Sequence, residues 1–212
     1  MRNANAFLSL NVAFALALQL LVSGPLFASG GDESDRLARG IAAHDAVRAG
    51  DFSRLGESLE LLGPEGWDRP SLAEAYHGSA MTLEALKAKQ DGKLLEALGF
   101  IDTGTKEIDE AVRKAPEDQD ARLLRMENSL DLCETSPVDR SKEASSDISF
   151  LRSRWASLSP ECRAIVELDS GRLSLAGRRL GEALGSWRSA VRDAPASEAA
   201  TRARTLIARY GE

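Results

Sequence analysis

The chain is poor in aromatic residues, cysteine and histidine. Aromatic residues make up 5% of its 212 residues, and there are two cysteines and two histidines. Leucine and alanine supply most of the 43% apolar content, and no segment alternates β-branched or aromatic residues with polar ones. A β-sandwich or barrel needs such alternation, whereas leucine and alanine favour helices packed at short distance. The composition therefore predicts an all-α fold.

The scarcity of histidine and cysteine also argues against a metal centre or a catalytic site. Zinc and iron sites need clustered ligands at fixed spacing, and His44 and His77 fall in different helical segments. The run Tyr76–Ser79 lacks the Gly-x-Ser-x-Gly pattern of a nucleophile elbow, and neighbouring residues on a helix point in different directions. We interpret Gly78 as permitting close helix approach. No metal, no cofactor and no enzymatic activity are expected.

No basic stripe is present either. The chain has 27 Lys and Arg against 33 Asp and Glu, a formal net charge of −6, and both signs are interleaved along its length. Nucleic-acid binding depends on clustered cations that contact the phosphate backbone. Nucleic acid is therefore excluded as the expected partner.

One long apolar run lies at the start of the chain. Arg2 provides a positive charge, Phe7–Val22 is mostly apolar, and Ala28–Gly30 supplies the small residues that a signal peptidase requires. The run is shorter than the ~20 residues of a transmembrane helix. We expect residues 1–30 to be a signal peptide and residues 31–212 to form an exported protein, periplasmic or secreted, without a membrane span. The alternative is an uncleaved membrane anchor.

After the leader, the chain predicts one helix after another. Apolar residues recur at intervals of three or four, with capping residues and Pro or Gly at the breaks. The predicted helices include 35–49, 53–62, 71–90, 94–112, 118–134 and 197–210. Ser136-Pro137 and Ser159-Pro160 also look like helix starts, because serine caps free N–H groups and proline fits the first turn. The loop 63–70 marks a weak sub-boundary within one helical-repeat domain, 31–212.

One spacing of small and aromatic residues occurs twice. It reads Gly171, Ala183, Trp187, Ala190 and Pro195, and earlier Gly92, Gly104, Ile108, Ala111 and Pro116. We interpret the later set as one helix hairpin in which Gly171 lies where two helices touch. A spacing that recurs predicts antiparallel hairpins stacked as a short solenoid, a class whose usual function is to hold another macromolecule.

Both sets resemble the tetratricopeptide repeat, a helix–turn–helix unit of about 34 residues. The separation of Gly92 and Gly171 exceeds two such repeats by about eleven residues, which predicts an insertion around Cys133–Arg140. A narrower resemblance, over Tyr76–Arg154, is to small uncharacterised exported bacterial proteins of tetratricopeptide-like fold. It rests on Ala75–Ser79, Gly104, Asp109–Val112, Pro116 and Arg122–Arg125. The resemblance implies a fold and no activity.

Cys133 and Cys162 are predicted to stay unpaired, although export favours disulfides. Cys133 lies at the end of one predicted helix and Cys162 at the start of the helix two further on. In an up-down stack these ends lie on opposite sides, separated by a helix length of about 25 Å. Bridged Cα atoms lie within ~7 Å of each other.

Three arginines are the candidate partner-binding residues. Arg122 and Arg125 lie on a helix that we expect to line the inner face of the stack, and Arg172 lies on the later equivalent helix. Guanidinium groups suit the carboxylates of a partner. The alternative is that Arg122 and Arg125 pair with acids of this chain, such as Asp109 or Asp147, and link the hairpins.

These patterns favour a non-catalytic exported scaffold that mediates protein–protein interaction in the cell envelope through a protein or peptide partner. The alternative is a carrier that binds a small ligand or lipid between the hairpins, with Trp67, Trp155 and Trp187 lining its pocket. A closed cavity would favour the carrier, and an open concave face would favour the scaffold. The sequence leaves the identity of the partner and the oligomeric state open.

Overall fold

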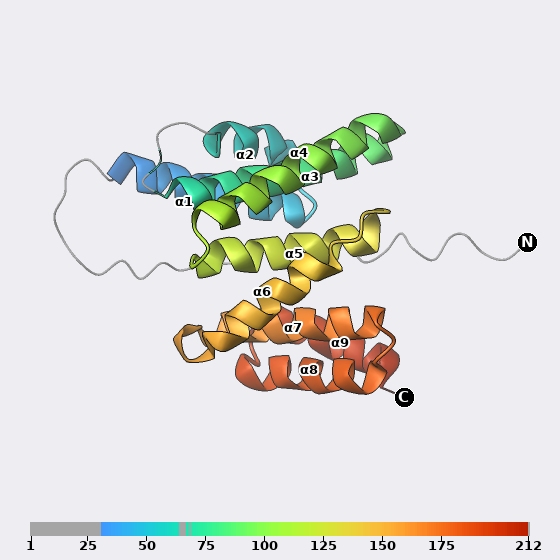
Figure 1. Ribbon diagram of the computed structural model, residues 1–212. Helices are drawn as coiled ribbons and strands as arrows, with labels where there is room; N and C mark the ends of the chain where they lie inside the picture. Colours follow the sequence, from blue (N-terminus) through green and yellow to red (C-terminus); the bar gives the residue numbers. More distant parts are fainter. Residues whose placement is uncertain (1–30, 64–66, 68, 212) are drawn as a thin grey trace, which may run out of the picture. The chain divides into compact units, whose positions relative to one another are not determined.

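The computed structural model describes residues 31–63, 67 and 69–211, so the predicted signal peptide at 1–30 lies outside the described residues. Over these ranges the chain forms nine α-helices, two short 3-10 helices and no strand (Figure 1), which confirms the all-α prediction. No helix in the described ranges combines the length and apolar character needed to cross a bilayer.

The helices follow the order expected from the sequence. They are α1 (Gly31–Arg48), η1 (Phe52–Arg54), α2 (Leu55–Leu61), α3 (Pro70–Gln90), α4 (Leu94–Lys114), α5 (Gln119–Thr135), α6 (Ser141–Ser153), η2 (Trp155–Ser157), α7 (Pro160–Ala176), α8 (Leu180–Asp193) and α9 (Glu198–Tyr210).

Side-chain caps explain where several helices begin. The Ser159 hydroxyl accepts a hydrogen bond from the backbone N–H of Cys162 at 3.1 Å, which starts α7 as predicted. The Ser197 hydroxyl accepts from Ala200 N at 3.1 Å and starts α9 in the same way. These starts are readable from sequence because the cap and its target are only three residues apart.

The predicted helix start at Ser136-Pro137 is wrong. The Ser136 hydroxyl donates to the carbonyl of Leu132 at 2.8 Å and so closes the end of α5. Helix α6 begins at Ser141, whose backbone N–H donates to the Asp139 carboxylate at 2.9 Å. The Ser136 hydroxyl also accepts the backbone N–H of Val138 at 3.2 Å, so it closes the end of α5 and holds the turn that follows, but it does not start a helix.

Residue contacts divide the chain into two compact units, one ending at Ala111 and one beginning at Val112, so the division falls within α4. The predicted sub-boundary at 63–70 lies within the first unit, in the α2–α3 connection, of which residues 64–66 and 68 are outside the described ranges.

In the first unit, α3 and α4 pack with their backbones in close approach. A Cβ atom added to Gly78 would lie 2.5 Å from the carbonyl oxygen of Gly104, and one added to Gly104 would overlap the carbonyl of Gly78. The two glycines therefore face each other across the helix pair, which confirms the interpretation of Gly78. Helix α1 packs on α2 and α3, and its apolar contacts gather around Val47, Leu55 and Ala80.

In the second unit, neighbouring helices pack in sequence: α5 on α6, α6 on α7, α7 on α8 and α8 on α9 (Figure 1). Trp187 of α8 is fully buried, and its indole N–H donates to the carbonyl of Leu168 in α7 at 3.2 Å. A Cβ atom on Gly171 would overlap the indole of Trp187. Gly171 thus lies at a helix crossing, as predicted.

The two copies of the predicted spacing occupy different structural positions at their first member. Gly171 lies inside α7, whereas Gly92 lies in the turn between α3 and α4 with a φ of +78°. In the first unit the glycines at the helix crossing are Gly78, which the spacing did not include, and Gly104, which is its second member. The shared offsets therefore do not place equivalent residues at the two crossings.

Candidate binding groove

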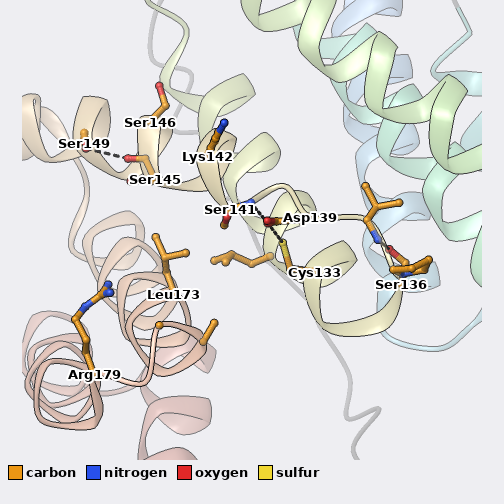
Figure 2. Close-up of a pocket in the computed structure, with 15 residues that line it drawn as sticks. Cys133, Ser136, Asp139, Ser141, Lys142, Ser145, Ser146, Ser149, Leu173 and Arg179 are labelled. Atoms are coloured by element: carbon orange, nitrogen blue, oxygen red, sulfur yellow. Dashed lines mark hydrogen bonds between the residues drawn. The ribbon is translucent and has the colours of Figure 1, made fainter.

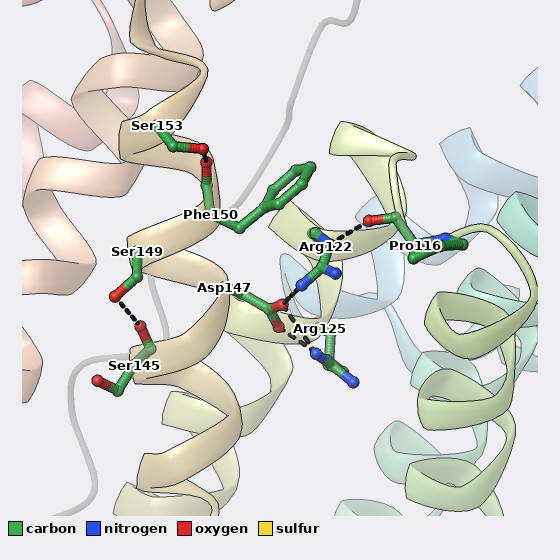
Figure 3. A network of polar contacts seen from close by, with 8 residues as sticks. All are labelled: Pro116, Arg122, Arg125, Ser145, Asp147, Ser149, Phe150 and Ser153. Atoms are coloured by element: carbon green, nitrogen blue, oxygen red, sulfur yellow. Dashed lines mark hydrogen bonds and ion pairs between the residues drawn. The ribbon is translucent and has the colours of Figure 1, made fainter.

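Arg122 and Arg125, two of the predicted partner-binding residues, both pair with Asp147 of α6 (Figure 3). Arg125 Nε and Nη2 donate to the two carboxylate oxygens at 2.7 and 2.8 Å, and Arg122 Nη1 donates to one of them at 2.9 Å. The Asp147 side chain is fully buried. The contact with Asp147 that the sequence raised as an alternative is therefore present and connects α5 to α6.

Arg172, the third predicted residue, lies in a second cluster of charges. Its guanidinium group pairs with Asp169 at 2.9 Å in the same helix and with Asp131 at 2.7 Å and Glu134 at 2.8 Å in α5. These carboxylates raise the pKa of Arg172, although its burial opposes that shift. Burial raises the pKa of Asp169, against the opposing effect of Arg172. Among the residues that the structure describes, none forms a hydrogen bond with the Oδ2 atom of Asp169.

The structure thus brings Arg122 and Arg125 together at one carboxylate and places Arg172 in a separate cluster. The side chains of the three arginines are 15%, 13% and 6% exposed, so each directs its charge mainly into the protein. A partner that bound these arginines would have to compete with the carboxylates that already pair with them. Partner binding by these residues stays a prediction.

An open groove of about 890 Å³ lies in the second unit (Figure 2). We call it the serine groove. Its lining residues are Leu130, Cys133, Ser136, Pro137, Val138, Asp139, Ser141, Lys142, Ser145, Ser146, Ser149, Leu173, Ala176, Gly177 and Arg179. They come from the end of α5, the loop to α6, one face of α6, and the end of α7 with the turn that follows it.

The groove presents a row of hydroxyl groups. Ser141, Ser145 and Ser149 follow each other at intervals of four residues, so they share one face of α6. Figure 2 shows these serines on one side and Leu173 and Arg179 on another. Hydroxyls donate and accept hydrogen bonds, and the leucine supplies apolar contact. The four-residue serine spacing was readable in the sequence, but nothing there showed that this face would line a groove.

The charges of the groove lie on Lys142, Arg179 and Asp139. The Asp139 carboxylate accepts the backbone N–H of Ser141, and hydrogen bonding from Ser141 lowers the pKa of Asp139. Arg179 pairs with Glu182 at 2.8 Å, and both side chains are more than half exposed. Exposed ion pairs of this kind are weak and exchange easily. Lys142 and Arg179 can therefore interact with acidic groups that enter the groove.

Both cysteines are free thiols. Cys133 lies in the groove, where its sulfur accepts the backbone N–H of Arg140 at 3.1 Å and lies 3.8 Å from Asp139. Burial raises the pKa of the Cys133 thiol, and burial also raises that of Cys162. A thiol with a raised pKa is mostly protonated at neutral pH and is a poor nucleophile. The groove thus offers Cys133 as a contact group.

The first unit contains a hydrogen-bonded Asp–His–Ser chain that the sequence did not reveal. His44 Nδ1 lies 3.1 Å from the Asp45 carboxylate, and His44 Nε2 lies 2.9 Å from the Ser79 hydroxyl. This connectivity matches that of a serine hydrolase. However, His44 is fully buried and Ser79 is 3% exposed, so the hydroxyl has no access to substrate. These hydrogen bonds connect α1 to α3, and the His44 ring packs nearly perpendicular to that of Tyr76.

None of the three tryptophans lines the serine groove. Trp187 is fully buried between helices. The guanidinium of Arg36 lies 4.2 Å from the ring centroid of Trp67, and that of Arg163 lies 5.8 Å from that of Trp155. These rings therefore pack against arginines and helices of the chain.

Within the described ranges, no group of three or more His, Cys, Asp or Glu side chains is arranged to hold a metal ion. No protein-family model, curated protein or solved structure matches the chain.

Proposed function

We propose that the chain is a non-catalytic, exported helical-repeat scaffold that binds a segment of a partner protein in the serine groove. The open groove is the observation that carries this proposal. An extended segment exposes backbone N–H and C=O groups, which the hydroxyls of Ser145 and Ser149 can pair with, while Leu130 and Leu173 accept apolar side chains. An open groove suits a segment that enters and leaves without unfolding the protein.

The solenoid arrangement is part of the same proposal. Support for it comes from the order of packing in the second unit, where each helix from α5 to α9 contacts the next along the chain. Helix α9 would close the stack, since Arg204 and Arg209 are exposed on it and a terminal repeat needs a polar outer side. In this arrangement Arg125 and Arg172 stabilise the packing of neighbouring helices, and the partner segment binds in the serine groove.

The carrier alternative is not favoured by a specific observation. It requires an enclosed apolar pocket between the hairpins with tryptophans in its wall, and the groove is open, rich in hydroxyls and free of tryptophan. The enzyme alternative would need an accessible nucleophile, and Ser79 is buried.

Site-specific crosslinking tests the groove. A photoreactive amino acid replaces Ser145, which is exposed in the groove, or Ser153, which is exposed on the same helix outside it. In envelope extracts, we expect position 145 to crosslink one defined partner that position 153 does not. Ser145→Arg should abolish capture of that partner, while Ser153→Arg should leave it intact, with circular dichroism confirming that both variants fold. Equal crosslinking from both positions would overturn the proposal.

A further inference from the structure

The start of α4 carries an exposed group of leucines. Leu94, Leu95 and Leu98 are 61%, 87% and 45% exposed, and we call them the leucine tip. They lie in the first two turns of α4, at the end of the α3–α4 pair that reaches beyond α1 and α2 in Figure 1. The tip belongs entirely to the first unit.

Packing of the fold does not account for these leucines. Helix α4 buries Ala97, Ile101 and Ile108, which lie on its inner face. Single exposed leucines are common on protein surfaces. Three within five residues form a contiguous apolar patch, and such patches mark contact with another protein or with a membrane.

Three lysines precede the leucine tip, at the end of α3 and in the turn to α4. Lys87, Lys89 and Lys93 are all exposed and are three of the six lysines in the chain. The acids beside them are Asp91, in the turn, and Glu96, which pairs with Lys93 at 3.5 Å. Over residues 87–98, lysines therefore outnumber acids three to two, in an otherwise acidic protein. Lys87 and Lys89 also lie in the last turn of α3, where positive charge interacts favourably with the helix dipole. The lysines therefore indicate a binding surface only in combination with the exposed leucines.

We propose that the leucine tip is a membrane-contact site that inserts into the surface of a bilayer with anionic headgroups. Leucine side chains at the interface bury in the acyl region, while lysines keep their ammonium groups at headgroup level and attract anionic lipid. The other candidate occupant is a second copy of the chain. Three partly exposed leucines cannot provide the roughly 800 Å² per partner of a stable protein interface, whereas insertion into lipid requires no matching surface.

Vesicle sedimentation tests the proposal with the full chain. Phosphatidylcholine vesicles containing phosphatidylglycerol should bind the protein, and Leu95→Glu should weaken binding at least about tenfold, because a buried leucine is lost and a charge is introduced. Leu180→Glu is the matched control, since Leu180 is a 40% exposed leucine of α8 outside the tip. It should bind as the unmodified protein does.

The lysines are expected to contribute less to vesicle binding than the leucines do. Lys87→Ala should weaken binding about fivefold at low salt, since one lysine near an anionic surface contributes on the order of 1 kcal/mol. Lys106→Ala, on the same helix pair but away from the tip, should have no effect. Binding to vesicles of phosphatidylcholine alone should be weaker, and Lys87→Ala should not change it. An equal loss from both lysine variants would overturn the assignment.

A spin label distinguishes the tip from any other part of the chain that binds lipid. With Cys133 and Cys162 replaced by serine, a label on Leu95→Cys should become accessible to oxygen and shielded from a water-soluble relaxing agent when vesicles are added. A label on Leu180→Cys should stay in water. A label at 95 that stays in water, or concentration-dependent self-association abolished by Leu95→Glu, would overturn the proposal, the second outcome in favour of a dimer.

Discussion

Helices cross closely in both units, but different groups meet at the two crossings. In the first unit, α3 and α4 approach until the backbones at Gly78 and Gly104 touch. In the second, Gly171 makes room for the indole of Trp187, and arginine–carboxylate pairs, of which Arg125–Asp147 is buried, connect α5 to its neighbours. Glycine at a helix crossing thus serves two purposes: it lets backbone meet backbone, or it receives a large side chain.

This difference matters for how each unit tolerates change. At a backbone-to-backbone contact, strain cannot be relieved by substituting a smaller side chain, because no side chain makes the contact. A glycine that receives an aromatic ring can be repacked by altering the ring. Buried ion pairs add a dependence on charge and pH that a glycine crossing lacks.

The largest expected effects come from adding one methyl group at each crossing. Gly78→Ala places a Cβ atom 2.5 Å from the carbonyl of Gly104, and Gly171→Ala drives it into Trp187. Overpacking costs about 1–3 kcal/mol, and we expect about 3 kcal/mol for Gly78→Ala and about 2 kcal/mol for Gly171→Ala in the free energy of unfolding, measured by urea denaturation.

A second substitution separates the two crossings. Trp187→Phe combined with Gly171→Ala should be less destabilising than the sum of the single changes, because the smaller ring relieves the overlap. Ile108→Val, the matched change opposite Gly78, should add to Gly78→Ala without relief, since the obstacle there is a carbonyl oxygen. If the second substitution reduced the destabilisation equally at both crossings, the two crossings would not differ in the way described.

Arg125→Ala tests the polar connection of the second unit. It leaves the buried carboxylate of Asp147 with Arg122 alone. Breaking a buried pair costs about 3–5 kcal/mol, and the remaining arginine should reduce the loss to about 2 kcal/mol. Arg152→Ala, which removes an exposed ion pair with Glu167 from the same helix bundle, should cost less than about 1 kcal/mol. Thermal melting of both variants measures the contrast, and equal melting temperatures would contradict it.

Asp169→Asn should change how stability depends on pH. Burial raises the pKa of Asp169, while Arg172 and Arg202 oppose the shift and Asp131 reinforces it. The folded protein therefore holds this proton more tightly than the unfolded chain does. The resulting stabilisation is complete below the unfolded pKa of about 4 and is lost as pH rises through the folded pKa.

The measurement is urea denaturation of both proteins between about pH 4 and pH 7. The free energy of unfolding of the unmodified protein should fall relative to that of Asp169→Asn as the pH rises. A constant difference across this range would show that Asp169 has the same pKa in the folded and unfolded states.

The smallest expected effects are stabilising. At Gly99 of α4 and Gly185 of α8, an added Cβ atom would meet no atom of another described part of the chain within 4 Å. Gly99→Ala and Gly185→Ala should each raise the free energy of unfolding by roughly 0.5–1 kcal/mol, because alanine loses less backbone freedom on folding. A loss of stability at either site would mean that helix contact extends beyond the crossing glycines.

Signals that act within a few residues were predicted well. The leucine–alanine composition indicated the helical class, and Ser159 marked the start of α7 because a cap and its target are close in sequence. Ser136 misled, since its hydroxyl donates backward to Leu132 and accepts the backbone N–H of Val138 ahead of it, yet no helix follows at this point. A forward hydrogen bond from a serine hydroxyl is therefore also compatible with a turn and does not by itself mark a helix start.

Contacts between distant residues were beyond the sequence pattern. The repeated spacing did not include Gly78, where α3 crosses α4 opposite Gly104, because no local rule fixes where along its length a helix is crossed. Pairing of Arg125 with Asp147 could be raised only as one alternative among several acids. The contact of His44 with Ser79, 35 residues apart, and the serine groove both depend on how helices meet.

The burial of His44 and Ser79 has a consequence for activity-based profiling. A fluorophosphonate probe labels serines that a neighbouring imidazole activates and that solvent can reach. Ser79 meets the first condition by its distance to His44 and fails the second. The native protein should therefore stay unlabelled in a serine-hydrolase screen, even though a search for Asp–His–Ser geometry alone would select it.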